Sequence, residues 1–143
     1  HWEDMMRRAV TYLDPEGAVP KLGRYSHAAI TTPGRLAFVA GQVAVDDAGA
    51  PVAAHDLARQ VPVVFANVGK VLHGLGADFD DVLEFTSYIV GDDARDGWYR
   101  ARDAVYERLY PTGAYPPNTL LIITGLAKPE FRVEVSAVVR LPD

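Results

Sequence analysis

Three side chains carry groups that could act on a small molecule. Glu134 lies between two valines in a strand-like run, so its carboxylate points away from theirs and can serve as a general base in a cleft. Tyr25 offers a phenol that can hydrogen-bond a substrate or an attacking water while its ring packs beneath. Asn118, which follows two prolines, offers a neutral amide. Together these residues are suited to proton transfer and to holding a polar ligand.

The same residues have structural alternatives that the sequence leaves open. Glu134 can form an ion pair with Arg132 or Arg140 of the same strand. Tyr25 can be a half-buried tyrosine that closes a loop, and Asp103 can be an ordinary carboxylate on a helix surface. None of these three alternatives requires a ligand.

Several chemistries lack the residues that they would need. The chain has no cysteine, which removes disulfides, thiolate nucleophiles and cysteine-based metal sites. Its four histidines show no H-x-x-x-H or H-E-x-x-H spacing, and the acidic run near Asp80 lacks the spacing of a calcium loop. No phosphate-binding loop, dinucleotide fingerprint or G-x-S-x-G elbow is present. We therefore expect no metal and no cofactor.

Composition and charge describe an acidic globular chain. Its net charge of −5 and pI of about 5.3 disfavour nucleic acid as a partner, since the average field repels phosphates. Apolar runs such as 120–123 are far too short to cross a bilayer, and the start of the chain has no secretory pattern. With cysteine absent, we expect a cytoplasmic protein without a membrane partner.

The pattern of apolar residues predicts one α+β domain over 23–143, preceded by an N-terminal extension over 1–22. In the extension, the spacing of Trp2, Met5, Met6, Val10 and Leu13 predicts a short amphipathic helix that packs on the domain. The domain should contain strands at 28–31, 36–40, 82–90, 119–123 and 131–139, with helices at 56–75 and 98–110. Residues 32–35 should join the first two strands as a hairpin turn.

These elements predict a single mixed sheet with two helices on one face. Along the second helix, Trp98, Ala101, Val105 and Leu109 should face inward, while Arg102 should lie mostly outward. The strand at 119–123 carries apolar residues on both of its faces. A chain of 143 residues cannot cover the second face of the sheet alone, so we expect it to self-associate.

Several short segments, in this order and spacing, resemble the Rid (YjgF) family of imine and enamine deaminases over about residues 23–140. The segments are Gly23-Arg24-Tyr25-Ser26-His27, Phe38-Val39-Ala40-Gly41-Gln42, Asp80-Asp81-Val82, Pro116-Pro117-Asn118-Thr119 and the run from Arg132 to Arg140. The resemblance implies a fold like that of small chorismate mutases. It also implies a homotrimer with ligand sites in the clefts between subunits.

The resemblance also implies roles for individual residues. Glu134 falls where the family positions a hydrolytic water, Tyr25 lines the cleft, and Gly41 exposes backbone N–H groups to the ligand. Asn118 stands where deaminating members carry an arginine that binds the substrate carboxylate. Asp103 falls near a position that is often asparagine.

The departures from the family pattern shape the expected ligand. Arg24 stands where proline is common, and it either replaces the charge missing at Asn118 or is simply solvated. Ala40 replaces a frequent serine, and Leu120 makes the cleft more apolar. We therefore expect hydrolysis of imines or enamines with a less carboxylate-dependent substrate. The alternatives are a non-catalytic ligand-binding or regulatory trimer and, ranked lower, an endoribonuclease.

Overall fold

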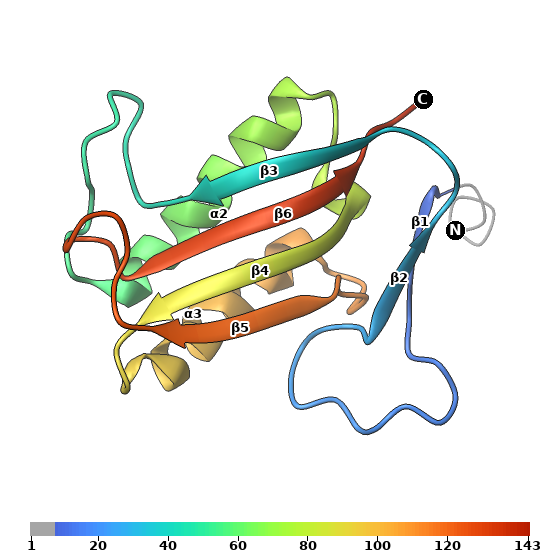
Figure 1. Cartoon of the computed structure of the whole chain (residues 1–143), viewed down its shortest axis with the longest axis horizontal. Helices are drawn as coiled ribbons and strands as arrows, with labels where there is room; N and C mark the ends of the chain where they lie inside the picture. The colour runs from blue at the N-terminus through green and yellow to red at the C-terminus, as the bar shows by residue number, and fades with distance from the viewer. Residues whose placement is uncertain (1–7) are drawn as a thin grey trace.

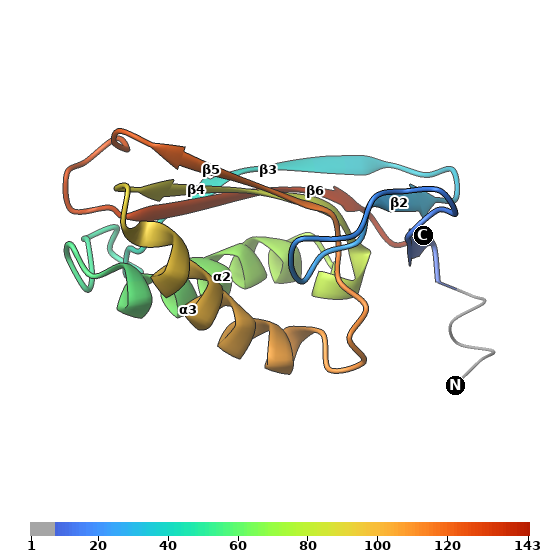
Figure 2. The same ribbon diagram turned by 90° about the horizontal axis from the view of Figure 1, so that it is seen from below.

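The computed structural model describes residues 8–143, and its main element is a mixed sheet with the strand order β3-β6-β4-β5. β4 and β5 run parallel, while β6 runs antiparallel to both β3 and β4. The helices cover one face of this sheet and leave the other open (Figure 1 and Figure 2). The predicted α+β class and its one-sided arrangement are thus confirmed. The elements are β3 (Leu36–Gln42), α2 (Leu57–Gly74), β4 (Val82–Val90), α3 (Ala94–Leu109), β5 (Asn118–Ile123) and β6 (Val133–Arg140).

The core lies between the sheet and the helices. On β6, Val133, Val135 and Ala137 point to the helices and are buried, while the residues between them are half-buried on the open face. The apolar stripe of α2 meets this surface, and the ring of Phe65 packs against Phe85 with centroids 5.6 Å apart. Each such buried side chain contributes roughly 1.5–3 kcal/mol by leaving water. The sheet is therefore held firmly on one side only.

The helix boundaries have local causes. The carboxylate of Asp56 accepts a hydrogen bond from the Arg59 backbone N–H (3.2 Å), which caps α2 as its position in the sequence predicts. A short 3₁₀ turn, η1 (Phe79–Asp81), leads into β4. α3 begins at Ala94, before the predicted Trp98, because the loop at Gly91–Asp93 turns directly into the helix.

The prediction that Arg102 lies outward on α3 is wrong. Its side chain is 2% exposed, and its guanidinium lies 4.7 Å from the ring centroid of Tyr106. Trp98 and Tyr99 also flank it, at 5.8 and 5.6 Å. Stacking on aromatic faces lets an arginine be buried with its charge retained. A helical position that the sequence pattern predicts to face solvent is thus buried.

Two predictions about the N-terminal part of the chain are wrong. Val10–Leu13 forms a strand, β1, and not the end of a helix; the remainder of the predicted helix, with Trp2, Met5 and Met6, lies outside the described residues. β1 pairs with β2 (Ala28–Thr31) in a separate two-stranded ribbon. The predicted hairpin between β2 and β3 does not form, because residues 32–35 run extended between the ribbon and the sheet (Figure 1).

Candidate functional site

Glu134 and Gly41 lie side by side on the open face of the sheet. β3 bulges between Val39 and Gln42, so two residues of β3 face a single residue of β6. A Cβ added at Gly41 would collide with the carboxyl group of Glu134. Only glycine allows this close approach of backbone and carboxylate. The bulge thus places an exposed stretch of backbone directly beside a half-buried acid.

Neither Arg132, just before β6, nor Arg140, at its end, forms an ion pair with Glu134, which disfavours the structural alternative for this acid. Arg132 donates from Nε and Nη2 to the carbonyl oxygen of Val90, at 3.0 and 2.8 Å. Arg140 donates to Thr32 Oγ1 and to the carbonyl oxygen of Pro33. Among residues 8–143, no ion pair to Glu134 is found. Its carboxylate is therefore left to act on water or ligand.

Asn118 is held by a residue that sequence reasoning missed. The hydroxyl of Ser87, which is completely buried in β4, donates to Asn118 Oδ1 at 2.7 Å. The amide oxygen is occupied by this bond, so the amide N–H donors remain to face a ligand. Leu120 lies two residues further along β5 on the same face of the sheet, opposite Ser87. The start of β5 thus presents neutral donors beside an apolar side chain.

Within one chain, Asn118 and Glu134 lie on opposite faces of the sheet. Asn118 is opposite Phe85, whose buried ring points to the helices, whereas Glu134 is opposite Tyr88 on the open face. Alternate residues of a strand project to opposite sides. The two side chains therefore cannot act on one small molecule in an isolated chain.

Tyr25 lies in the long loop between β1 and β2. Its hydroxyl accepts a hydrogen bond from the Leu22 backbone N–H at 3.1 Å, and its ring meets His27 edge-on at 5.8 Å. His27 in turn lines a groove of about 410 Å³, together with Glu84 and the proline just before Asn118. Tyr25 thus lies in a loop, as predicted. This loop reaches the end of the sheet where β5 begins.

The carboxylate of Asp14 closes the base of this loop. It accepts hydrogen bonds from the Lys21 ammonium (2.8 Å) and the His27 backbone N–H (2.9 Å). These two donors lower the pKa of Asp14 below its usual value. The loop that carries Tyr25 is thus tied by an ionised side chain at neutral pH.

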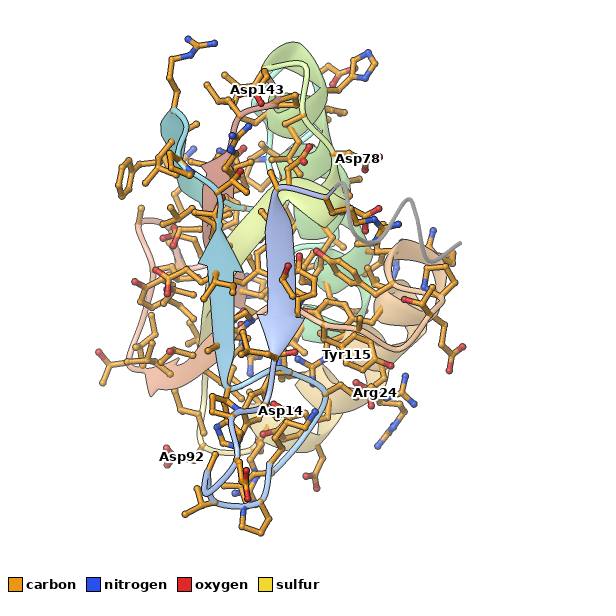
Figure 3. All side chains as sticks on the ribbon, turned by 90° about the vertical axis from the view of Figure 1, so that its right-hand side faces the viewer. Asp14, Arg24, Asp78, Asp92, Tyr115 and Asp143 are labelled. Atoms are coloured by element: carbon orange, nitrogen blue, oxygen red, sulfur yellow. The ribbon has the colours of Figure 1, made fainter. Side chains whose placement is uncertain are left out.

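Arg24 and Asp103 come together, as members of a small charge cluster on α3. Arg24 Nε lies 3.7 Å from Asp103 Oδ2, and its Nη1 lies 3.9 Å from Glu107 Oε1 (Figure 3 shows the Arg24 side chain beside this helix). The buried Arg102 donates from Nε to Asp103 Oδ1 at 3.0 Å. Arg24 is therefore neither freely solvated nor a free cation that could replace the charge missing at Asn118.

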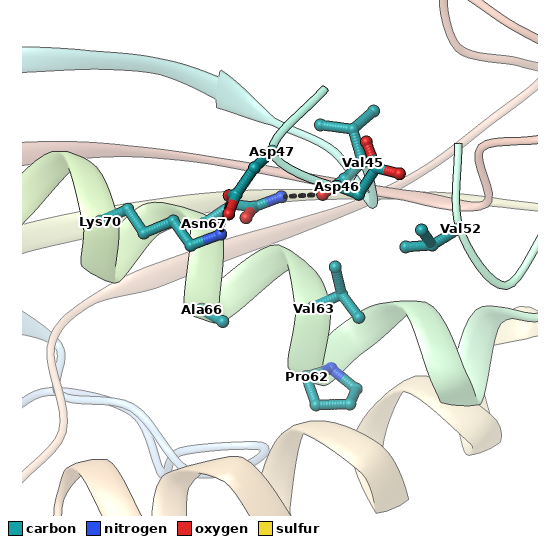
Figure 4. Close-up of a pocket in the computed structure, with 9 residues that line it drawn as sticks. All are labelled: Val45, Asp46, Asp47, Val52, Pro62, Val63, Ala66, Asn67 and Lys70. Atoms are coloured by element: carbon teal, nitrogen blue, oxygen red, sulfur yellow. Dashed lines mark hydrogen bonds and ion pairs between the residues drawn. The ribbon is translucent and has the colours of Figure 1, made fainter. Parts of the chain in front are cut away.

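A shallow hollow of about 530 Å³ lies between α2 and the loop after β3 (Figure 4). Its walls are mainly apolar, and Lys70 and Asp47 form an ion pair at its rim. None of the predicted site residues lines it. Across residues 8–143, no group of three or more side chains is suited to hold a metal ion, and no helix of that range is long and apolar enough to span a membrane.

The structure thus gathers the predicted residues into three groups: Gly41 with Glu134, Arg24 with Asp103, and Asn118 with Leu120. Tyr25 lies on the loop that carries Arg24. No signal in the sequence marks Arg102 as buried, because its charge suggests a position on the surface. Ser87 carries a weak one, because a serine within the apolar run of β4 must find a hydrogen-bond partner once buried.

Residues 16–141 match the endoribonuclease L-PSP family. Among relatives, the chain is 30% identical to the protein DfrA of Myxococcus xanthus, over 94% of this chain and 98% of DfrA. It is 23% identical to the human 2-iminobutanoate/2-iminopropanoate deaminase, over 94% and 90% of the two chains. Among solved structures, YyfB of Yersinia pestis, a protein of the conserved Rid family, superposes with a TM-score of 0.83 at 28% identity, covering 94% of this chain and all of YyfB.

Proposed function

Because the chain belongs to the Rid (YjgF) family, which also bears the name endoribonuclease L-PSP, we propose that it hydrolyses reactive imines or enamines to a carbonyl compound and ammonia. The observation that carries this proposal is the Glu134 carboxylate, which forms no ion pair among residues 8–143 and lies beside the bare backbone of Gly41. The likeness to a human 2-imino-acid deaminase supports the reaction class.

The reaction needs little from the protein beyond placing water and moving protons. Once the enamine has taken a proton on carbon, water adds to the carbon of the C=N bond while Glu134 accepts a proton from that water. The nitrogen of the tetrahedral adduct is protonated and leaves as ammonia, and the carbonyl group forms. One water is consumed for each ammonia released. General-base assistance of this kind contributes about 10²–10⁴-fold to the rate.

The opposite faces of Asn118 and Glu134 require a second copy of the chain for a complete site. We propose a homotrimer, the assembly that the family resemblance implies, with Glu134 and Gly41 of one copy facing Asn118, Tyr25 and the Arg24–Asp103 pair of the next. The open face of the sheet supports this assembly, because its apolar side chains need cover. Phe38 is 79% exposed and Leu121 is 39% exposed there.

The neutral anchor at Asn118 sets the substrate class. An amide that presents N–H donors pairs with a carbonyl, amide or hydroxyl oxygen, and Leu120 favours an apolar group nearby. An arginine at this position would bind a carboxylate through two charge-assisted bonds. We therefore propose a neutral or larger imine as substrate and weak turnover of 2-aminoacrylate.

Ammonia release from a panel of imines generated in solution tests this function. Wild-type protein should release ammonia from at least one neutral imine faster than the uncatalysed rate, and Glu134→Gln should abolish the acceleration. Silence of the wild type across the panel, with tight binding of a metabolite, would instead support a non-catalytic ligand-binding trimer. Cleavage of RNA under the same conditions would favour the endoribonuclease, which the acidic charge of the chain disfavours.

A further inference from the structure

β3 leaves one long edge of the sheet open. Among the described residues, β3 pairs only with β6, and its other edge meets no strand. The strand is seven residues long and carries no lysine or proline that would discourage pairing. Leu36 and Phe38 on it are 46% and 79% exposed. Natural proteins rarely leave such an edge uncovered, because it recruits another strand.

The β1–β2 ribbon also has an unpaired edge. β2 pairs with β1 along one edge and with no described strand along the other. Ile30 on β2 is 59% exposed. A two-stranded ribbon is marginally stable alone. Figure 3 shows β2 on the side of the ribbon away from the helices, so its unpaired edge faces the same side as the open face of the sheet.

The sequences of β2 and β3 are typical of two strands that pair with each other, yet the two strands lie apart in this structure. Two short apolar strands joined by Thr32-Pro33-Gly34-Arg35 are typical of a hairpin. The buried guanidinium of Arg140 instead holds this linker, donating to Thr32 Oγ1 (3.1 Å) and to the carbonyl oxygen of Pro33 (2.6 Å). Leu141 N–H donates to the carbonyl oxygen of Arg35 at 2.9 Å.

Gly34 is adapted to this extended linker, because a Cβ there would collide with the Arg140 guanidinium. At the other end of the ribbon, Tyr12 of β1 donates to the carbonyl oxygen of Val82 at 2.7 Å and so fixes the ribbon to its own subunit. The groove of about 410 Å³ lies between β2, the first residues of β4 and the last residues of β6. Both free edges are thus displayed at fixed positions on the subunit.

We propose that β2 of one copy pairs with the open edge of β3 of a second copy, so that neighbouring subunits exchange their β1–β2 ribbons. Each chain carries one donor edge and one acceptor edge, so the occupant of β3 is a second copy. Antiparallel pairing in the register of the predicted hairpin sets Ala29 opposite Phe38 and Ile30 opposite Ala37. Ile30 then lies next to Ala37, on the helix-covered face of the sheet.

The absence of cysteine makes this pairing directly testable. Ala29→Cys and Phe38→Cys would be introduced into separately tagged chains, which are then co-expressed, purified through both tags and mildly oxidised. Directly opposed residues of an antiparallel pair lie close enough for a disulfide. We expect a covalent dimer of the two differently tagged chains. Replacing Ala29→Cys by Ile30→Cys provides the control, since residue 30 faces the opposite side from Phe38 and should link at least tenfold less.

The double variant Ala29→Cys/Phe38→Cys in a single chain separates exchange from a closed hairpin. Exchange predicts covalent oligomers on a denaturing gel. An internal link that leaves a monomer band would overturn the proposal in favour of a hairpin within one chain. Failure of both designs to link, in protein whose circular dichroism matches the wild type, would overturn it as well.

Discussion

The hydroxyl of Ser87 donates to Asn118 Oδ1 at 2.7 Å, from a position on the neighbouring strand that is wholly buried. This bond leaves the amide N–H groups of Asn118 as donors for the ligand that we propose. The position to which the family resemblance assigns a charged anchor therefore holds an oriented, neutral amide in this chain.

Ser87→Ala should loosen this anchor and destabilise the fold. The amide oxygen of Asn118 would lose its partner while half-buried, at a cost of about 1–3 kcal/mol. Urea unfolding would measure the change in the free energy of unfolding. Ser136→Ala is the matched control, because Ser136 is half-buried on the open face of β6. Equal effects of the two substitutions would contradict the role given to Ser87.

Gly41→Ala should remove most of the hydrolytic activity and leave the fold intact. The new methyl group would collide with the Glu134 carboxyl and push it away from the bulge. A displacement of 1 Å can cost about 100-fold in rate. Gly74→Ala is the control, since a Cβ at the end of α2 meets nothing within 4 Å. Ammonia release that survives Gly41→Ala unchanged would show that this carboxylate does not place the water.

The Asp14 carboxylate ties the base of the Tyr25 loop together, and this tie should be lost at low pH. Hydrogen bonds from Lys21 and the His27 N–H lower the pKa of Asp14 below 3.8, so the tie is complete above that pH and is lost as the pH falls through the lowered value. The amide proton of His27, followed by NMR, should shift as the pH falls below about 3.8.

Asp14→Asn should remove this titration, whereas Asp47→Asn should leave it unchanged, because Asp47 pairs with Lys70 on α2. A His27 amide signal that does not move between about pH 3.8 and pH 2 in the wild type, with the fold intact, would contradict the tie.

Much of the fold follows from local patterns in the sequence. Asp56 caps α2 at the expected residue, and the apolar run at 82–90 forms β4 with the expected ends. The pairing of β2 was not predictable in this way. Alternation shows that a segment is a strand, but the strand pairing here depends on Arg140 holding Thr32, a contact between residues 108 positions apart.

The candidate residues can be named from the sequence, but the way in which they are arranged could not be predicted from it. Glu134 and Gly41 meet because of a bulge, which shifts the register of β3 by one residue without leaving a mark in the apolar pattern. The burial of Arg102 depends on aromatic rings from its own helix, which a charge-based reading places in solvent. Such features arise from packing between elements and not from the preference of any one segment.

The proposed site retains a hydrolytic carboxylate and replaces the anchor for a carboxylate-bearing substrate. The most direct test of this proposal is the rate of ammonia release from 2-aminoacrylate by the wild type, Asn118→Arg and the double variant Asn118→Arg/Glu134→Gln. A charged hydrogen bond worth about 1.5–3 kcal/mol predicts a gain of roughly 10–150-fold in Asn118→Arg, and its loss in the double variant. An unchanged rate in Asn118→Arg, in protein that folds and assembles as the wild type does, would contradict the proposal.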